Sequence, residues 1–157
     1  PLTNPAGAKG QILGVFAAEL TETFASVLRE LGSRRALVVH GNDGMDEITT
    51  TTTTRISELR DGRITTSEFD PLHYIDRLAS PSDLAGGDAQ TNAGITKTGL
   101  SGAHGPPRVI VCLNAAGAVI AGGGADDFKT AMAMAAESLD SGKALKALEA
   151  LVAGTAP

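Results

Sequence analysis

The stretch ALVVHGNDGMDEI, Ala36 to Ile48, joins an apolar run to a loop that holds three carboxylates. The run from Ala36 to His40 is typical of a buried strand. The carboxylates follow the carboxyl end of that strand, which is where open α/β sheets place their ligands. Gly41 and Gly44 let the backbone turn tightly enough for the acids to converge. The stretch therefore predicts an α/β sheet with a candidate site at one strand end.

The three carboxylates belong to Asp43, Asp46 and Glu47. Carboxylate oxygens are the ligands that hard cations such as magnesium and calcium prefer. The calcium-hand pattern D-x-[DN]-x-[DN]-G does not fit, because Gly44 directly follows Asp43. The spacing favours magnesium that is shared with a phosphate-bearing ligand. A solvated turn that binds nothing is the alternative interpretation.

The residues before this stretch predict a β-α-β unit. Gln11 to Phe16 is typical of a strand, and Ala18 to Leu31 predicts a helix that stops at Gly32. A strand, a helix and the strand at Ala36 to His40 imply parallel pairing with a right-handed crossover. The apolar face of the helix is predicted to consist of Leu20, Phe24, Val27, Leu28 and Leu31.

Two further segments after the acidic loop are typical of strands. The six consecutive threonines at Thr49 to Thr54 are β-branched and favour extended backbone. Arg55 to Leu59 and Arg63 to Phe69, joined through Asp61-Gly62, predict a β-hairpin. We expect this hairpin to lie at an edge of the sheet.

The second half of the chain is predicted to be mainly helical. Asp70 to Ala85 is expected to be irregular, and Asp88 to cap a helix that runs to about Ser101. Val109 to Ala121 is nearly all apolar, so strand and buried helix are hard to separate by pattern, although the alanines and glycine of its second half favour a helix. Two more helices are predicted, Asp126 to Leu139 and one capped by Ser141, with inner faces formed by Phe128, Met132, Ala135, Leu139, Leu145, Leu148 and Val152.

Composition is that of a globular protein. The 157 residues are 42% hydrophobic and 20% charged, which is ordinary for one compact domain, and we treat residues 1–157 as a single domain. The net charge of −5 argues against nucleic acid as a partner. No apolar run is long enough for a membrane span. Cys112 lies alone in an apolar run, so we expect a packing thiol and a reducing, cytoplasmic compartment.

Several segments occur together in a recognisable order: PLTNPAG (Pro1 to Gly7), QILGVF (Gln11 to Phe16), RALVVHGNDGMDEIT (Arg35 to Thr49), GGDAQTNA (Gly86 to Ala93), LNAAGAV (Leu113 to Val119) and DSGKALKALEALV (Asp140 to Val152). In that order and at those intervals, they resemble the C-terminal α/β portion of the anthranilate phosphoribosyltransferase family. The most specific elements are the PLTNPA start and the HGxDGxDE loop taken together.

The resemblance implies a fold, a reaction and site residues. The fold would be a mostly parallel sheet with flanking helices, an incomplete copy of the C-terminal domain of the nucleoside phosphorylase/phosphoribosyltransferase fold. The reaction would be transfer of phosphoribosyl from phosphoribosyl pyrophosphate (PRPP) to anthranilate in tryptophan biosynthesis, with release of pyrophosphate, by a homodimer that uses magnesium. By match to HGxDGxDE, Asp46 and Glu47 would ligate magnesium and Asp43 would shape the loop. Pro1 and Asn4 would border the substrate. We expect His40 to be structural, and we assign no catalytic residue.

The chain departs from the family in two ways. The N-terminal helical domain, its GTGGD phosphate loop and the segments that hold anthranilate are absent, and the chain starts at Pro1 without Met. We therefore expect a fragment, or one piece of a cut enzyme, that is inactive without its N-terminal half. Within the matched region the departures are Gly94, Lys97 to Gly99, Val109 and Gly117. The extra helix glycines should each cost about 0.5 to 1 kcal/mol relative to alanine.

Two alternatives remain open. A pyrimidine nucleoside phosphorylase is related in architecture and also acts at an anomeric carbon, but it needs no acidic magnesium pair. A non-catalytic α/β lobe that only binds a partner would use the acidic loop as a solvated turn. Magnesium dependence separates the transferase from both.

Overall fold

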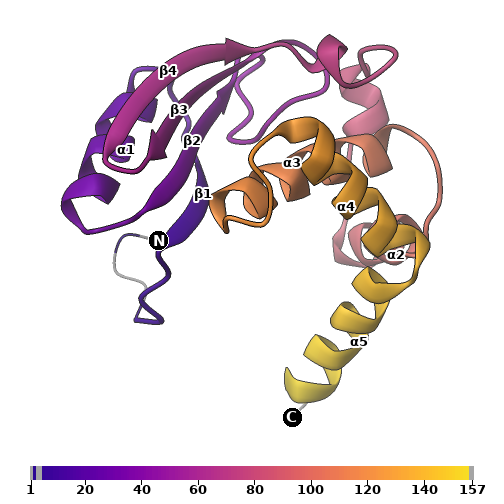
Figure 1. The fold of residues 1–157 in the computed structure, drawn as a ribbon. Coiled ribbons are helices and arrows are strands. Elements are labelled where there is room, and N and C mark those ends of the chain that lie inside the picture. The colour runs from indigo at the N-terminus through magenta and orange to yellow at the C-terminus, as the bar shows by residue number, and fades with distance from the viewer. Residues whose placement is uncertain (1, 3–4, 156–157) are drawn as a thin grey trace.

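The computed structural model describes residue 2 and residues 5–155 (Figure 1). Pro1 and Asn4, predicted to border the substrate, lie outside the described residues. In chain order the elements are β1 (Gly10–Gly14), α1 (Leu20–Glu30), β2 (Arg35–Gly41), β3 (Thr54–Arg60), β4 (Arg63–Phe69), the 3₁₀ helices η1 (Pro71–His73) and η2 (Pro81–Leu84), α2 (Ala89–Leu100), α3 (Pro106–Ala121), α4 (Phe128–Asp140) and α5 (Lys143–Thr155).

The described strands form one sheet in the order β1-β2-β3-β4. The α/β class and the β-α-β unit are confirmed, because α1 connects β1 to β2 and these two strands pair in parallel. The prediction of a mostly parallel sheet is wrong, because β2 pairs with β3, and β3 with β4, in antiparallel fashion. The reason lies in the connections, since parallel pairing needs a crossover and these strands are joined by loops alone. The predicted hairpin is confirmed, and its turn carries the positive φ angles of Asp61 and Gly62.

The threonine run is not a strand. Only Thr54 belongs to β3, and the residues before it form a loop. Threonine hydroxyls satisfy this loop locally: Thr49 N–H donates to Thr54 Oγ1 at 3.0 Å, and Thr51 N–H donates to Thr49 Oγ1 at 3.0 Å. Such side-chain bonds to the backbone compete with a strand ladder, so β propensity alone gave the wrong prediction.

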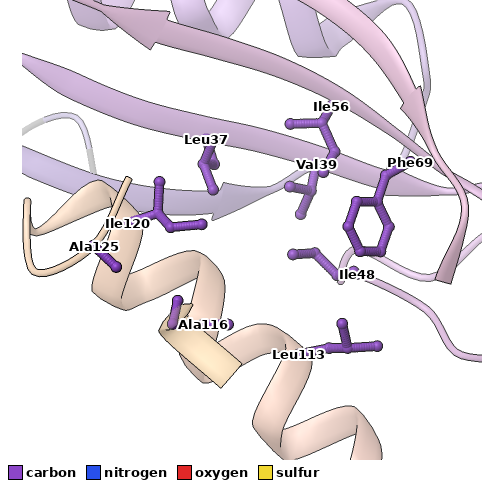
Figure 2. Close-up of a cluster of buried hydrophobic side chains, with 10 residues drawn as sticks. Leu37, Val39, Ile48, Ile56, Phe69, Leu113, Ala116, Ile120 and Ala125 are labelled. Atoms are coloured by element: carbon purple, nitrogen blue, oxygen red, sulfur yellow. The ribbon is translucent and has the colours of Figure 1, made fainter. Parts of the chain in front are cut away.

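Two helical layers cover the sheet. Alternate residues of β2 face opposite sides, so Ala36 and Val38 pack with α1 while Leu37 and Val39 pack with α3. Figure 2 shows side chains from the sheet and from α3 converging on this second cluster. Its members are Leu37, Val39, Ile48, Ile56, Phe69, Leu113, Ala116, Ile120, Ala125 and Ala131. The core therefore lies directly beneath the loop that follows β2.

The inner face of α1 agrees with the prediction in part: Leu28 is buried, and Leu20 and Phe24 pack partly buried against the same cluster. The buried residues of α1 are Thr21, Ala25 and Leu28, whereas Val27 is 37% and Leu31 56% exposed. Small residues allow the helix to lie close to the sheet, and hydrophobicity alone does not reveal them.

The predicted helices of the second half are confirmed as helices, with errors in one inner face and one cap. The predicted inner face of α5 is not buried: Leu145 and Leu148 are only partly buried and Val152 is 58% exposed, because α5 packs mainly on α4 and α2 and not on the sheet.

α3 is a helix rather than a strand, and Asp88 caps α2 by accepting a hydrogen bond from Thr91 N–H at 2.8 Å. Ser141 is the C-terminal cap residue of α4 instead of the start of α5. In Figure 1, α5 extends away from the sheet towards the C-terminus. None of the described helices is long and apolar enough to cross a membrane.

Candidate functional site

The acidic loop, residues 42–53, leaves the carboxyl end of β2 beside the carboxyl end of β1. Its first turn is closed by two backbone hydrogen bonds, from Gly41 N–H to Met45 O and from Gly44 N–H to Gly41 O, both 2.8 Å. Gly44 has φ +94°, a backbone conformation that glycine adopts without a steric penalty. The sequence thus builds the tight turn that brings the carboxylates to the end of the sheet.

Two glycines let backbone and side chain approach closely at this turn. A Cβ on Gly14, the last residue of β1, would lie 1.7 Å from the backbone oxygen of Asp46. A Cβ on Gly41 would lie 2.6 Å from Asp43 Oδ1. Any side chain at Gly14 would therefore displace the loop, which makes the end of β1 part of the site.

Asp43 is engaged inside the loop. Its Oδ2 accepts hydrogen bonds from the hydroxyls of Thr49, at 2.6 Å, and Thr51, and its Oδ1 accepts one from Met45 N–H at 3.1 Å. Burial raises the pKa of Asp43, but these three hydrogen bonds outweigh burial, so its pKa lies below the usual value. Both carboxylate oxygens of Asp43 accept hydrogen bonds from the loop itself, which agrees with the loop-shaping role predicted for this residue.

Asp46 and Glu47 differ from Asp43. Both are exposed, and neither carboxylate has a hydrogen bond or ion pair within the described part of the chain. The two predicted magnesium ligands are therefore consecutive exposed residues whose carboxylates are not engaged by other described groups.

Asn114 of α3 fixes the residue that follows the carboxylate pair. Its Oδ1 accepts a hydrogen bond from Ile48 N–H, and its Nδ2 donates to Ile48 O, both at 2.9 Å. The Ile48 side chain is fully buried in the core. Sequence reasoning did not assign this role to Asn114. The available signal was an amide in the middle of an otherwise apolar helix, where a buried polar group needs a partner.

His40 links the two parallel strands. Its Nδ1 lies 2.8 Å from Val15 O, just beyond β1, and Val15 N–H donates to Val39 O at 3.0 Å. This contact agrees with the structural role expected for His40 at the strand end. Cys112 is buried in α3, and that burial raises the pKa of its thiol, as expected of a packing residue.

The donor set at the loop suits magnesium of one kind. Across residue 2 and residues 5–155, no cluster of three or more His, Cys, Asp and Glu could enclose a metal ion. Magnesium is usually bound through one or two carboxylates together with substrate phosphates and water. Asp46 and Glu47 fit that mode, because they are consecutive, exposed carboxylates that are not engaged by other described groups.

Comparison with known proteins bears on the same segments. Residues 1–145 match the family model described as "Glycosyl transferase family, a/b domain". The chain belongs to this family. An anthranilate phosphoribosyltransferase of Syntrophobacter fumaroxidans, similar to this chain, is 56% identical over 97% of it, and one of Desulfosudis oleivorans is 52% identical over 97%. Each match covers 45% of the relative, so the chain spans less than half the length of these glycosyl transferases.

Solved structures from the same family share the fold. The anthranilate phosphoribosyltransferase of Thermus thermophilus superposes with a TM-score of 0.88 at 37% identity, over 98% of this chain and 45% of that one. The Saccharomyces cerevisiae enzyme "in complex with PRPP and Mg" gives a TM-score of 0.79 at 27% identity, over 89% of this chain and 41% of that one. The predicted resemblance to the C-terminal part of these transferases is confirmed.

Proposed function

We propose that this chain is the C-terminal α/β portion of an anthranilate phosphoribosyltransferase. The complete protein would transfer phosphoribosyl from PRPP to anthranilate and release pyrophosphate, in tryptophan biosynthesis. The observation that carries the proposal is the 56% identity to such a transferase over 97% of the chain. The free carboxylate pair at the strand end supports it, because a reaction that expels pyrophosphate requires stabilisation of negative charge.

Asp46 and Glu47 are the residues that we propose to hold magnesium. When bound, magnesium neutralises charge on the phosphate oxygens of the donor and of the departing pyrophosphate. The chain's own contribution is positional. Asn114 fixes Ile48 at one end of the pair, and Asp43 with its two threonine hydroxyls holds the turn at the other. We propose no general base on this chain.

The remaining contacts would come from the N-terminal half of the complete protein. Among the described strands β1 has a neighbour on one side only, and its outer edge is open. Phe16, two residues beyond β1, is 81% exposed. An open strand edge and an exposed aromatic ring both favour coverage by another segment. We propose that residues 1–157 act as one domain that is inactive alone, that Pro1 and Asn4 border the substrate, and that the complete enzyme is a cytoplasmic homodimer.

The decisive experiment joins this chain to its N-terminal half and follows the loss of anthranilate fluorescence with PRPP, with and without magnesium. Asp46→Asn and Glu47→Gln should each abolish most of the magnesium-dependent activity, by roughly 100-fold or more, because a ligand is lost. Calorimetry of PRPP binding with magnesium should show the same loss of affinity. Circular dichroism should show unchanged folding, because both side chains are exposed.

Glu22→Gln is the matched control, since it neutralises an exposed carboxylate in the first turn of α1 without touching the acidic loop. It should leave activity and PRPP binding unchanged. Activity that persists without magnesium would contradict the role of the pair. Phosphorolysis of a pyrimidine nucleoside without metal would favour the phosphorylase instead, and a complete protein with neither activity would favour a non-catalytic lobe.

A further inference from the structure

A half-enclosed cavity of about 410 Å³ is lined in part by Thr50. Thr50 belongs to the part of the acidic loop from Thr49 to Thr53, which we call the threonine loop. The other walls of the cavity come from residues 75–79, from η2 and from the N-terminal turn of α3. Ile75, Leu78 and Val109 supply apolar surface. The volume falls within the range of roughly 300 to 1,000 Å³ that is typical of small-molecule sites. We call it the loop–helix cavity.

Thr50 gives this cavity an unused hydrogen-bonding group. The residue is 1% exposed, and its hydroxyl has no hydrogen-bond partner among the described residues. Its neighbours differ: the hydroxyls of Thr49 and Thr51 both donate to Asp43. Buried hydroxyls are normally paired, because an unpaired one loses its bonds to water without replacement.

The cavity wall at Thr50 is held in place by the backbone. Ala79 N–H donates to Thr50 O at 2.9 Å, which ties the wall formed by residues 75–79 to the threonine loop. Leu78, in the same wall, is 42% exposed although it is a large apolar residue. An occupant that contacts Leu78 and Thr50 together would bury this apolar surface and pair the hydroxyl.

Charge at the cavity disfavours an anion. The first two residues of α3, Pro106 and Pro107, have no N–H, and the N–H groups of Arg108 and Val109 both donate to Gly105 O. This helix start therefore offers no free donors of the kind that bind phosphate. Asp76, Arg77 and Asp83 line the cavity and together carry one net negative charge.

We propose that the loop–helix cavity binds an uncharged small molecule with an apolar body of ring size and one hydroxyl or amide group, which pairs with Thr50. The site is separate from the proposed magnesium ligands, yet its occupant contacts the residue between the two threonines that hold Asp43. The inference does not depend on the transferase activity proposed above.

The test uses the complete protein with labelled Ile, Leu and Val methyl groups and three probes: phenol, toluene and benzoate. Phenol should shift the methyl resonances of Ile75, Leu78 and Val109 in a saturable manner, while Leu28 and Leu59 in the opposite layer stay unchanged. Toluene, which lacks the hydroxyl, should bind several-fold more weakly, and benzoate should not bind. Thr50→Val, which keeps the shape, should weaken phenol roughly threefold to tenfold and leave toluene unchanged.

Two further variants keep the result interpretable. Thr98→Val, at an exposed position of α2, should leave all three titrations unchanged. Leu78→Ala removes apolar wall at an exposed position and should weaken phenol and toluene alike. The proposal is overturned if phenol causes no saturable shifts, if benzoate binds better than phenol, or if Thr50→Val binds phenol as the unaltered protein does. The first result would mean that the cavity binds no such molecule, the second that it prefers an anion, and the third that the Thr50 hydroxyl takes no part in binding.

Discussion

α3 and α2 are neighbouring helices, but they differ in composition and in burial: α3 is almost entirely apolar, whereas half of the residues of α2 are polar. α3 lies against the sheet and buries six residues, including Leu113 and Ala116 at 0% exposure. α2 buries none, and neither does α5, the other helix that it contacts. The chain therefore has an anchored part, formed by the sheet with α1, α3 and α4, and an uncovered part, formed by α2 and α5.

The helix glycines show what this difference means. A Cβ on Gly117 of α3 would lie 2.7 Å from Ile12 Cδ1 and 3.1 Å from Ile48 Cδ1, so the glycine permits close packing of α3 on the sheet. A Cβ on Gly94 or Gly99 of α2 would meet nothing within 4 Å. Glycine is the expected departure from the family at all three positions. At Gly117 it permits close packing of α3, whereas at Gly94 and Gly99 it lowers the stability of α2 and permits no closer packing.

The largest effect should follow from removing a side chain of the anchored part. Leu113→Ala should lower the free energy of unfolding by about 2 to 5 kcal/mol, because it opens a cavity in the core that Figure 2 shows. Urea unfolding measures this change. Leu151→Ala in α5, where the leucine is 62% exposed, is the matched control and should change the free energy by less than about 0.5 kcal/mol. Equal losses would refute the division of the chain.

Adding a side chain should have the next largest effect. Gly117→Val should cost about 1 to 3 kcal/mol, because its Cβ and methyl groups would force Ile12 and Ile48 aside. Gly94→Val places the same side chain in open space. It should be nearly neutral in thermal unfolding, and a large loss there would show that α2 is covered.

A smaller, pH-dependent effect is expected at Asp43. Its pKa is lowered on folding, so its ionised form contributes stability that is fully present above the ordinary value of 3.8. That stability is lost as the pH falls through 3.8 towards the lower pKa of the folded state. Asp43→Asn should therefore flatten the dependence of unfolding free energy on pH below about pH 4. Thr98→Val, at an exposed position of α2 that carries no titratable group, should leave that slope unchanged.

The smallest effect should have the opposite sign. Gly94→Ala and Gly99→Ala should each raise the stability of α2 by about 0.5 to 1 kcal/mol, because alanine restricts the unfolded chain and meets no obstacle in the helix. Differential scanning calorimetry would register the change as a higher melting temperature. A lower melting temperature would mean that these positions pack against a segment of the complete protein.

Sequence reasoning succeeded where the signal was local. Hydrophobic periodicity located the β-α-β unit, the hairpin and the three helices α2 to α4, and the Asp88 cap followed from its position. It failed where the outcome depends on specific side-chain hydrogen bonds or on the fit of small residues, which hydrophobic periodicity does not show. The threonine run is a loop because its hydroxyls bind Asp43 and one another, and α1 turns Thr21 and Ala25 inward because small residues fit against the sheet.

The candidate site divides in the same way. The order of acids and glycines was sufficient to place three carboxylates at a strand end. It could not show which of them are free, because that depends on which carboxylate accepts the hydroxyls of Thr49 and Thr51. Gly14 and Asn114 could not be assigned because their partners are distant in the chain.

The contact between Gly14 and Asp46 makes the end of β1 and the acidic loop one mechanical unit. Because no side chain separates them, a shift of β1 along its axis would press on the backbone of Asp46. β1 is one of the two edge strands of the described sheet, the other being β4. A segment that pairs with the outer edge of β1 would therefore shift the backbone of the acidic loop. The positions of the loop carboxylates would then depend on whether that edge is paired.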